Sequence, residues 1–469
     1  MCMLKISEKE GDCLTKRSYE IDMCNGPLFR SLLLFALPLL ASNLLQLLFN
    51  AVDLMVAGNF VGSQALAAVG ATTSLITVCT TLFVGIALGA NVLAGRFYAQ
   101  KDDEGMSEVV HTAITLAIIG GICVLFIGII LCRPALELVS TPEEVIDQST
   151  LYMRIYFLGM PFFMCYNFGA SILRSIGDTR RPLYYLIFAG VCNVVLNLIL
   201  VLIFHLGVAG VAIGTVMSQF ISSVLVLTTL HREQTSYHLD VRKLHLNAHI
   251  MKNMLRIGVP AGLQSMLINV SNVLIQSSVN TFGTLAIAGN TAGFNINGFL
   301  YFACNSVTQA ALSFSSQNSG VGNYKRINKI LFQCGILECI VGFGLGNLCY
   351  LFGHQILGLY ASDPQVIAYG LINVAIICVP YGLCGLMDMI PGCIRGMGYS
   401  TVPMLLSLIG VVCLRFFWIF IIFPSHRSLE TLYISYPVSW ILTIGMQAIC
   451  YVWVWRHCTK KEQVRINHG

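Results

Sequence analysis

The 469 residues of this chain are 56% hydrophobic and only 10% charged, and their mean hydropathy is +0.76. Soluble domains carry about 25% charged residues, so this composition excludes a soluble globular protein and indicates a polytopic membrane protein. The net charge of +5 comes without any basic patch interleaved with aromatic residues, which excludes a nucleic-acid-binding surface.

Twelve apolar segments follow one another along the chain, and each has about 20 residues or more, enough to cross the hydrocarbon core as a helix. In chain order they cover residues 30–57, 65–95, 109–132, 151–173, 183–204, 207–230, 254–282, 285–314, 330–352, 366–394, 402–423 and 432–455. Runs of this length do not fit the strands of a membrane barrel. We therefore predict an all-α fold of twelve transmembrane helices.

The positions of Lys and Arg predict the orientation of these helices. If the N-terminus is cytoplasmic, 23 of the 27 basic residues fall on the cytoplasmic side. Arg133 and Arg427 then lie in outer loops, and Arg154 and Arg415 lie within segments. This is the asymmetry of the positive-inside rule. We expect a multi-pass protein of the plasma membrane with both termini in the cytoplasm.

The two halves of the chain repeat each other. PLLASNLLQLLFNAVD from Pro38 aligns with PAGLQSMLINVSNVLI from Pro260, and RSIGDTRRP from Arg174 aligns with RGMGYSTVP from Arg395. The paired positions lie 221 or 222 residues apart. Because each half has an even number of helices, an axis along the membrane normal relates the halves, as in some secondary transporters.

This repeat predicts the domain organisation. We expect a cytoplasmic segment at 1–28, an N-lobe of six helices at 29–230, a cytoplasmic linker at 231–250, a C-lobe of six helices at 251–456 and a cytoplasmic tail at 457–469. The substrate then binds in a central cavity between the lobes. One chain supplies both lobes, so a monomer is sufficient.

A carboxylate stands inside the first apolar segment. Asn43, Gln46, Asn50 and Asp53 are spaced three, four and three residues apart, which places them on one helical face. A charged side chain at the membrane centre costs about 2.5 to 3.5 kcal/mol on insertion scales. We therefore expect Asp53 to face a cavity, a cation or a partner; a hydrogen-bonding clamp between helices is the structural alternative.

Several motifs together resemble one transporter family. They are Asp53 followed by VAGNFVGSQALAAVG, the paired loops RSIGDTRRP and RGMGYSTVP, NVVLNL with GVAGVAIGTVMSQ, and SSQNSGVGNYKR. Their joint pattern, over nearly the whole chain, resembles the multidrug and toxic compound extrusion family. The resemblance implies a cofactor-free, twelve-helix antiporter that exports small amphipathic, often cationic, organic compounds in exchange for Na⁺ or H⁺.

The resemblance also implies an ion-coupling site in the first half. Asp53, Asn193, Asn197 and Thr215 match positions where the family carries an acid, an Asn, often a second acid, and a Thr; Asn197 replaces the second acid. Oxygen-bearing side chains of this kind suit Na⁺, a hard cation, and a proton on Asp53 is the other possibility. Hydrogen bonding between helices is the structural alternative for the two asparagines. Beyond a possible Na⁺ at Asp53, we expect no metal.

The second half lacks the first-helix acid and carries another one. Ile275 stands at the position of Asp53, whereas Asp388 lies on the tenth segment. Asp388 is a second candidate for binding the ion or a cationic substrate, unless it forms a structural salt bridge with Arg415.

The cavity candidates are polar, Met and aromatic side chains, which adapt to varied organic cations but also pack helices together. They are Asn43, Gln46, Asn50, Met160, Met164, Asn167, Asn269, Asn272, Gln276, Tyr301, Tyr381 and Met387.

Other functional classes fit the sequence less well. The chain has no nucleotide-binding or nucleophile motif in a strand–turn–helix context, so we do not expect an enzyme. A lipid-linked oligosaccharide flippase is the runner-up, but it would need a basic cavity that Arg154 and Arg415 do not supply. A membrane scaffold or receptor, surrounded by lipid but without transport activity, would gain little from the intramembrane acids Asp53 and Asp388.

Overall fold

The computed structural model describes residues 19–139 and 141–468, and the side chains up to residue 464. Most of the segment predicted at 1–28, with four of the basic residues counted on the cytoplasmic side, lies outside this part of the chain, as does the side chain of Arg465. The helices are α2 (Leu28–Val56), α3 (Ser63–Gln100), α4 (Asp103–Leu138), α5 (Glu143–Leu158), α6 (Met160–Ser175), α7 (Arg180–Leu198), α8 (Gly207–Arg232), α9 (Ala248–Val279), α10 (Thr284–Gly320), α11 (Tyr324–Leu351), α12 (Gly353–Gly358), α13 (Pro364–Asn373), α14 (Tyr381–Gly396), α15 (Thr401–Ser407), α16 (Leu414–Phe417) and α17 (Leu429–His468).

The predicted segments correspond to these helices. In the described chain, nine helices are long and apolar enough to span a membrane, and eleven spans result if each of two bent pairs counts as one. The remaining predicted segment, 285–314, lies in α10, which has 37 residues but a more polar composition. Several helices exceed the predictions: α3 has 38 residues, about 57 Å at 1.5 Å per residue, against a hydrocarbon core of about 30 Å. The tail predicted from residue 457 is a helical continuation of α17.

The bends and turns repeat between the two halves. The helix axis bends by 47° between α5 and α6, where Pro161 occupies the first turn of α6, and by 43° before α14, where Pro380 is the N-cap residue. Both prolines stand where the preceding helix has to end or bend, because a proline removes a backbone hydrogen bond. Gly62 and Gly283 have φ of 123° and 94° in the α2–α3 and α9–α10 turns, a conformation that favours glycine.

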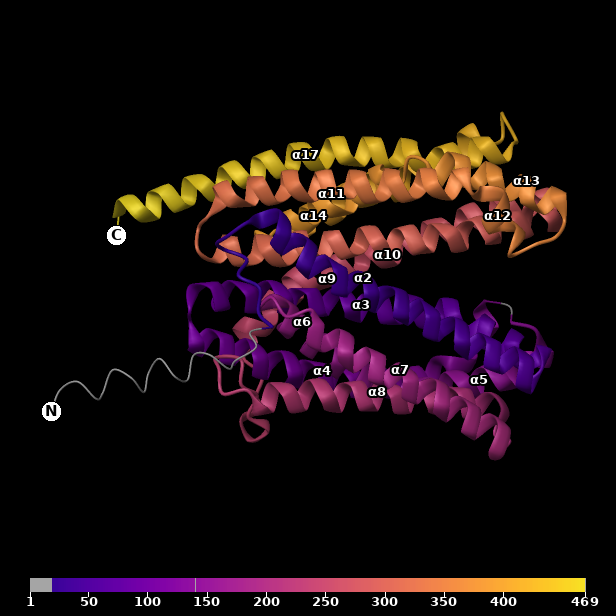
Figure 1. Ribbon diagram of the computed structural model, residues 1–469, viewed down its shortest axis with the longest axis horizontal. Coiled ribbons are helices and arrows are strands. Elements are labelled where there is room, and N and C mark those ends of the chain that lie inside the picture. Colours follow the sequence, from indigo (N-terminus) through magenta and orange to yellow (C-terminus); the bar gives the residue numbers. More distant parts are fainter. Residues whose placement is uncertain (1–18, 140, 469) are drawn as a thin grey trace.

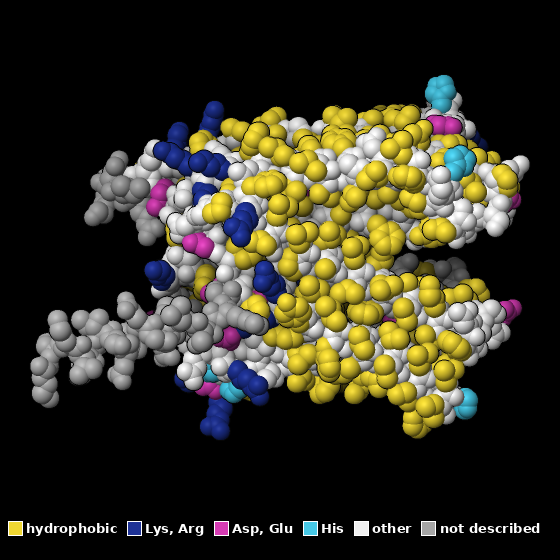
Figure 2. Space-filling view, viewed as in Figure 1, with side chains coloured by type: hydrophobic (Ala, Val, Ile, Leu, Met, Phe, Trp, Pro, Cys, Tyr) yellow, Lys and Arg dark blue, Asp and Glu magenta, His cyan; other side chains and the backbone are white. Residues whose placement is uncertain are grey.

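The helices form two bundles that lie side by side (Figure 1). Helices α2 to α8, coloured indigo to magenta, make the N-lobe, and the orange and yellow helices belong to the C-lobe. Lys and Arg side chains gather at the end of the molecule where α17 ends, which we call the basic end (Figure 2). A broad hydrophobic band covers the face in view, and a cleft separates the lobes at the opposite end.

The lobes meet from the middle of α3 and α9 to the basic end. Gly85 and Gly89 of α3 lie so close to α9 that a Cβ on either would collide with backbone atoms of Gly262 or Met254. Polar contacts continue this closure: Ser313 Oγ donates to Asn91 Oδ1 at 3.1 Å. Further contacts between the lobes run from Arg96 Nη2 to the Gly396 carbonyl (3.0 Å), from Arg174 Nη1 to Gln309 Oε1 (3.1 Å) and from Gln317 Nε2 to the Ser175 carbonyl (2.7 Å).

Candidate functional site

The structure brings three of the four predicted ion-site residues into direct contact inside the N-lobe. Asp53 lies near the end of α2, Asn197 on α7 and Thr215 on α8. Asn197 Nδ2 lies 2.5 Å from Asp53 Oδ1, and Thr215 Oγ1 donates to Asp53 Oδ2 at 3.1 Å. Asn193, one turn before Asn197, receives a longer bond of 3.4 Å from Asn197 Nδ2 on its Oδ1. Three helices far apart in sequence therefore converge on one carboxylate.

This carboxylate lies in an apolar setting. Asp53 is 7% exposed and Asn197 is fully buried, beside a core cluster that includes Tyr152, Val208 and Val211. Among the ion pairs of residues 19–139 and 141–464, none involves Asp53. Asn197 Oδ1 is buried without a hydrogen-bond partner. The site thus contains one acid, neutral side-chain oxygens and an unused acceptor.

Gly214 makes room for this arrangement. A Cβ at Gly214 would collide with Asn197 Oδ1, so a larger residue on α8 would push the amide away from Asp53. Glycine at this position lets α7 and α8 approach closely enough for both helices to reach the same carboxylate.

The polar face of α2 points in two directions. Gln46 and Asn50 are not buried, and they lie on the side of α2 opposite the exposed Leu37, Leu48 and Met55. The three hydrophobic side chains belong to the lipid-facing side, so Gln46 and Asn50 face the space between the lobes. Asn43, in contrast, is buried and donates to the Phe302 carbonyl of α10 at 3.4 Å.

The corresponding C-lobe helices hold a fixed cation instead of an acid. Ile275, at the position of Asp53, is buried in a hydrophobic cluster. Arg415 of α16 donates to Ser271 Oγ at 3.0 Å and to Asn272 Oδ1 at 2.7 Å, and its guanidinium lies 4.1 Å from the centre of the Tyr436 ring. These contacts occupy Arg415, and the described ion pairs include no bridge between Arg415 and Asp388.

Asp388 lies half-buried on α14, and its electrostatic partner is Arg395, two turns along the same helix. Arg395 is buried and donates to Gln264 Oε1 of α9 at 2.7 Å. Asn167, the equivalent of Asp388 in the N-lobe, bonds to the Phe163 carbonyl of its own helix at 2.8 Å.

Five of the twelve predicted cavity residues are buried between helices in this structure. Met160, Met164, Tyr381 and Met387 are buried within hydrophobic clusters in this conformation, and Asn43 is buried as described above, so their place in the cavity stays a prediction. The Met side chains fill gaps between helices within each lobe, a common use of Met. The remaining candidates keep some exposure: Gln46, Asn50, Asn167, Asn269, Asn272, Gln276 and Tyr301.

Sequence reasoning missed a polar network in the C-lobe. Asn290 Oδ1 accepts from Asn373 Nδ2 at 2.9 Å and from the Tyr433 hydroxyl at 2.8 Å, and Asn373 Oδ1 accepts from Asn297 Nδ2 at 3.2 Å. The available signal was the seven-residue spacing of Asn290 and Asn297, which places both on one face of α10. The network is uncharged and joins α10, α13 and α17.

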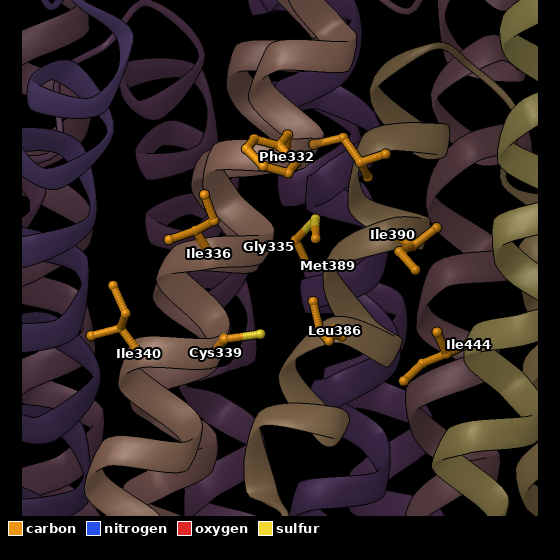
Figure 3. A pocket seen from close by; sticks show the side chains of 10 residues that line it. Phe332, Gly335, Ile336, Cys339, Ile340, Leu386, Met389, Ile390 and Ile444 are labelled. Atoms are coloured by element: carbon orange, nitrogen blue, oxygen red, sulfur yellow. The ribbon is translucent and has the colours of Figure 1, made fainter.

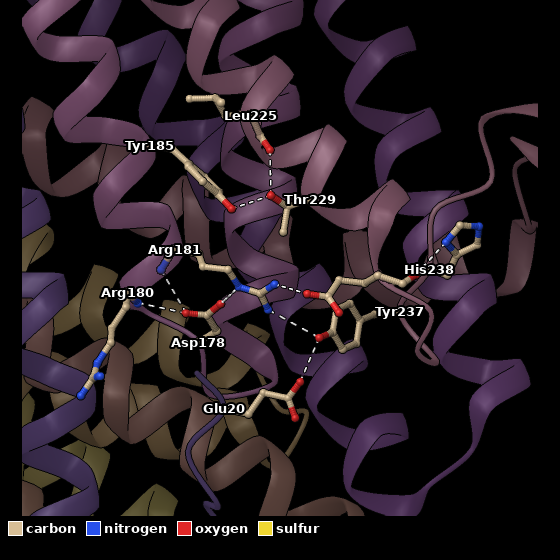
Figure 4. Close-up of polar contacts among 10 residues, drawn as sticks. Glu20, Asp178, Arg180, Arg181, Tyr185, Leu225, Thr229, Tyr237 and His238 are labelled. Atoms are coloured by element: carbon tan, nitrogen blue, oxygen red, sulfur yellow. Dashed lines mark hydrogen bonds and ion pairs between the residues drawn. The ribbon is translucent and has the colours of Figure 1, made fainter. Parts of the chain in front are cut away.

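At the basic end, the chain before α2 contacts both lobes. The hydroxyls of Tyr98 and Tyr237 donate to Glu20 at 2.6 and 2.9 Å, on the N-lobe side, and Figure 4 shows the contact from Tyr237. Arg326 Nη2 of the C-lobe donates to the Asn25 carbonyl at 2.8 Å. Figure 4 also shows Arg181 bound to Asp178. Arg181 bonds to Glu233 as well, and this bridge ties the α6–α7 loop to the residues after α8.

Comparison with known proteins decides the family. A family model described as MatE matches the chain twice, over residues 38–199 and 260–421. The chain belongs to the multidrug and toxic compound extrusion (MATE) family. The double match confirms the internal repeat, and MATE membership makes the chain a membrane transporter and not an enzyme.

Individual relatives agree with this assignment. The probable multidrug resistance protein YoeA of Bacillus subtilis is 30% identical over 448 residues, which cover 93% of this chain and 95% of the relative. The crystal structure of a MATE protein in the bent conformation covers 95% of this chain and 98% of its own, with a TM-score of 0.85 and 18% identity. An outward-facing MATE transporter structure covers 94% and 98%, with a TM-score of 0.82 and 19% identity. The predicted fold of twelve helices in two lobes is thereby confirmed.

Proposed function

We propose that this MATE transporter exports small amphipathic, often cationic, organic compounds in antiport with Na⁺ or H⁺. One observation carries the proposal: Asp53 is buried in the N-lobe, receives hydrogen bonds from the neutral side chains of Asn197 and Thr215, and has no basic partner in the described chain. A lone carboxylate in this setting is costly unless a cation or a proton neutralises it. The name of the YoeA relative supports drug export.

The geometry of the site suits a monovalent cation. Asp53, Asn193 and Thr215 supply oxygen atoms, and the partnerless Oδ1 of Asn197 supplies another after its amide rotates. Oxygen ligands of this kind bind hard cations, so Na⁺ fits. A proton on an Asp53 oxygen removes the same charge without any change in ligands. Both ions therefore relieve the same electrostatic cost.

The arrangement of the lobes supports alternating access. The lobes touch near the basic end through α3 and α9 and separate at the opposite end (Figure 2). The positive-inside rule assigns the basic end to the cytoplasm, so the cleft faces outward. In the proposed cycle, an ion bound at Asp53 favours one arrangement of α2, α7 and α8, and substrate bound between the lobes favours the other.

Polar and acidic groups along the cleft give the expected substrate class. Gln46 and Asn50 of α2 offer hydrogen-bonding groups, and half-buried Asp388 supplies a negative charge in the C-lobe. Tyr301, which is 39% exposed, adds an aromatic ring for contact with a cationic group. A flippase for lipid-linked pyrophosphates would need a basic cavity, whereas Arg415 is already engaged with Ser271 and Asn272.

The test is uptake of a fluorescent organic cation into inside-out proteoliposomes under an imposed Na⁺ gradient or an imposed H⁺ gradient. Accumulation driven by one gradient identifies the coupling ion. Absence of transport under both gradients would contradict the antiport proposal.

A further inference from the structure

An apolar groove lies on the surface of the C-lobe between α11, α14 and α17 (Figure 3). Its volume is about 470 Å³. The lining consists of apolar side chains, one glycine and one cysteine: Leu331, Phe332, Gly335, Ile336, Cys339, Ile340, Leu386, Met389, Ile390 and Ile444. Such a groove is too apolar to favour water or a polar ligand. Gly335 forms part of its floor, and a Cβ added there would meet Met389 and Leu386 at ordinary van der Waals distance.

One face of α11 leads from basic residues into this groove. Lys325 and Lys329 are not buried, and the exposed Phe332, Ile336 and Ile340 follow them at helical spacing. With a rise of 1.5 Å per residue, Lys325 lies about 10 Å before Phe332, and the groove continues about 12 Å further to Ile340. The same surface therefore presents two ammonium groups and then an apolar channel.

Aromatic residues mark the level of the membrane interface on the same helices. The Tyr451 hydroxyl of α17 donates to Asn328 Oδ1 at 2.7 Å, and Trp455 Nε1 donates to the Tyr324 carbonyl at 3.0 Å. Next to them on α17, Trp453 is 57% exposed, and exposed Trp concentrates where the headgroups meet the hydrocarbon. The lysines of α11 thus lie at headgroup depth, and the groove begins just inside the hydrocarbon. These two hydrogen bonds also close the seam between α11 and α17 on the headgroup side of the groove.

We propose that this surface binds one anionic phospholipid, with an acyl chain in the groove and the phosphate against Lys325 and Lys329. The apolar side chains of the groove contact one acyl chain in place of neighbouring lipids. The lysine side chains extend toward the headgroup layer. Attraction between lysines and anionic lipid favours phosphatidylglycerol over phosphatidylcholine. Glu462 of α17, beside Gly322, reduces the positive charge at this end without neutralising both lysines.

The test is native mass spectrometry of the full chain released from bilayers that contain equal amounts of phosphatidylglycerol and phosphatidylcholine. The wild type should retain phosphatidylglycerol preferentially. The K325Q/K329Q double variant should lose about 25-fold in that preference, which corresponds to about 1 kcal/mol for each lysine. Gly335→Leu should fill the groove and lower the retention of both lipids, because it removes the space for the chain.

Matched variants make the outcome decisive. K101Q/K252Q removes two exposed lysines at the basic end that do not line this surface, and it should retain lipid as the wild type does. If Gly335→Leu disturbs folding, Phe332→Ala is the alternative groove variant. Phe332 is exposed at the groove edge, and its removal should weaken lipid retention. Equal losses in K325Q/K329Q and K101Q/K252Q would show a general charge effect and overturn the proposal. Undiminished retention in both groove variants would overturn it as well.

Discussion

Gly262→Ala should shift the protein away from the conformation described here. Gly262 of α9 packs against α3, and a Cβ at this position would lie 2.5 Å from the Leu82 carbonyl oxygen. The contacting atoms are backbone, so the helices themselves would have to move apart. This contact lies about halfway along α3 and α9, at the limit of the region where the lobes meet, and in the proposed cycle it separates when the lobes open at the basic end. The substitution therefore destabilises the conformation described here selectively.

The magnitude follows from packing. Overpacking of a tight contact costs about 1 to 3 kcal/mol, which corresponds to a shift of about 5- to 150-fold between the two conformations. Hydrogen–deuterium exchange of the reconstituted protein should show faster exchange over residues 85–100 and 313–320, which lie at the lobe contact. Residues facing the cleft between the lobes should exchange more slowly.

Gly344→Ala is the matched control. Gly344 lies in α11, and a Cβ there meets nothing within 4 Å. This change replaces a helical glycine without a new contact, so the exchange pattern should stay that of the wild type. If Gly262→Ala also leaves the pattern unchanged, the α3–α9 contact does not hold the basic end closed, and the reasoning fails.

Two further predictions concern the ion site and the linker. Gly214→Ala should push Asn197 away from Asp53 and weaken ion-driven transport by about tenfold, which corresponds to about 1.4 kcal/mol. Circular dichroism should show an unchanged helix content. Ion-driven transport at the wild-type rate would show that Asn197 plays no part in coupling. The pKa of His245 is raised by its bonds to the Lys243 carbonyl and to Glu108. The resulting stabilisation is present below the ordinary His pKa of about 6.5 and is lost as the pH rises through the raised value. Intrinsic-rate-corrected hydrogen exchange of residues 241–247 should therefore increase with pH, and His245→Gln should abolish this dependence.

The helices and the repeat could be predicted because both leave local patterns in the sequence. Apolar runs of membrane length identified the spans, and paired motifs identified the two halves. Hydropathy also identified the segment in α10, although its buried polar side chains lower its mean hydropathy. Nearby prolines were the only signal in the sequence for the bends before Met160 and Tyr381. A proline alone does not predict a break in a helix, because Pro38 lies within the uninterrupted helix α2.

The environments of individual side chains were harder to predict. Asp53, Asn197 and Thr215 were selected by matching family positions, and their convergence depends on the packing of three helices. The burial of Met160 and Met164 could not be predicted, because a sequence pattern shows which helical face a residue occupies but not whether lipid, another helix or a cleft covers it. Whether the Asp53 cluster binds an ion stays a prediction.

The most direct test of the ion-coupling account compares Asp53→Asn with the wild type in two assays on the same proteoliposomes. The account predicts that the variant still binds the fluorescent cation and still exchanges it across the membrane, because the cleft residues are unchanged. It should fail to accumulate the cation under the Na⁺ or H⁺ gradient that drives the wild type. Gradient-driven accumulation at the wild-type level in Asp53→Asn would contradict the account.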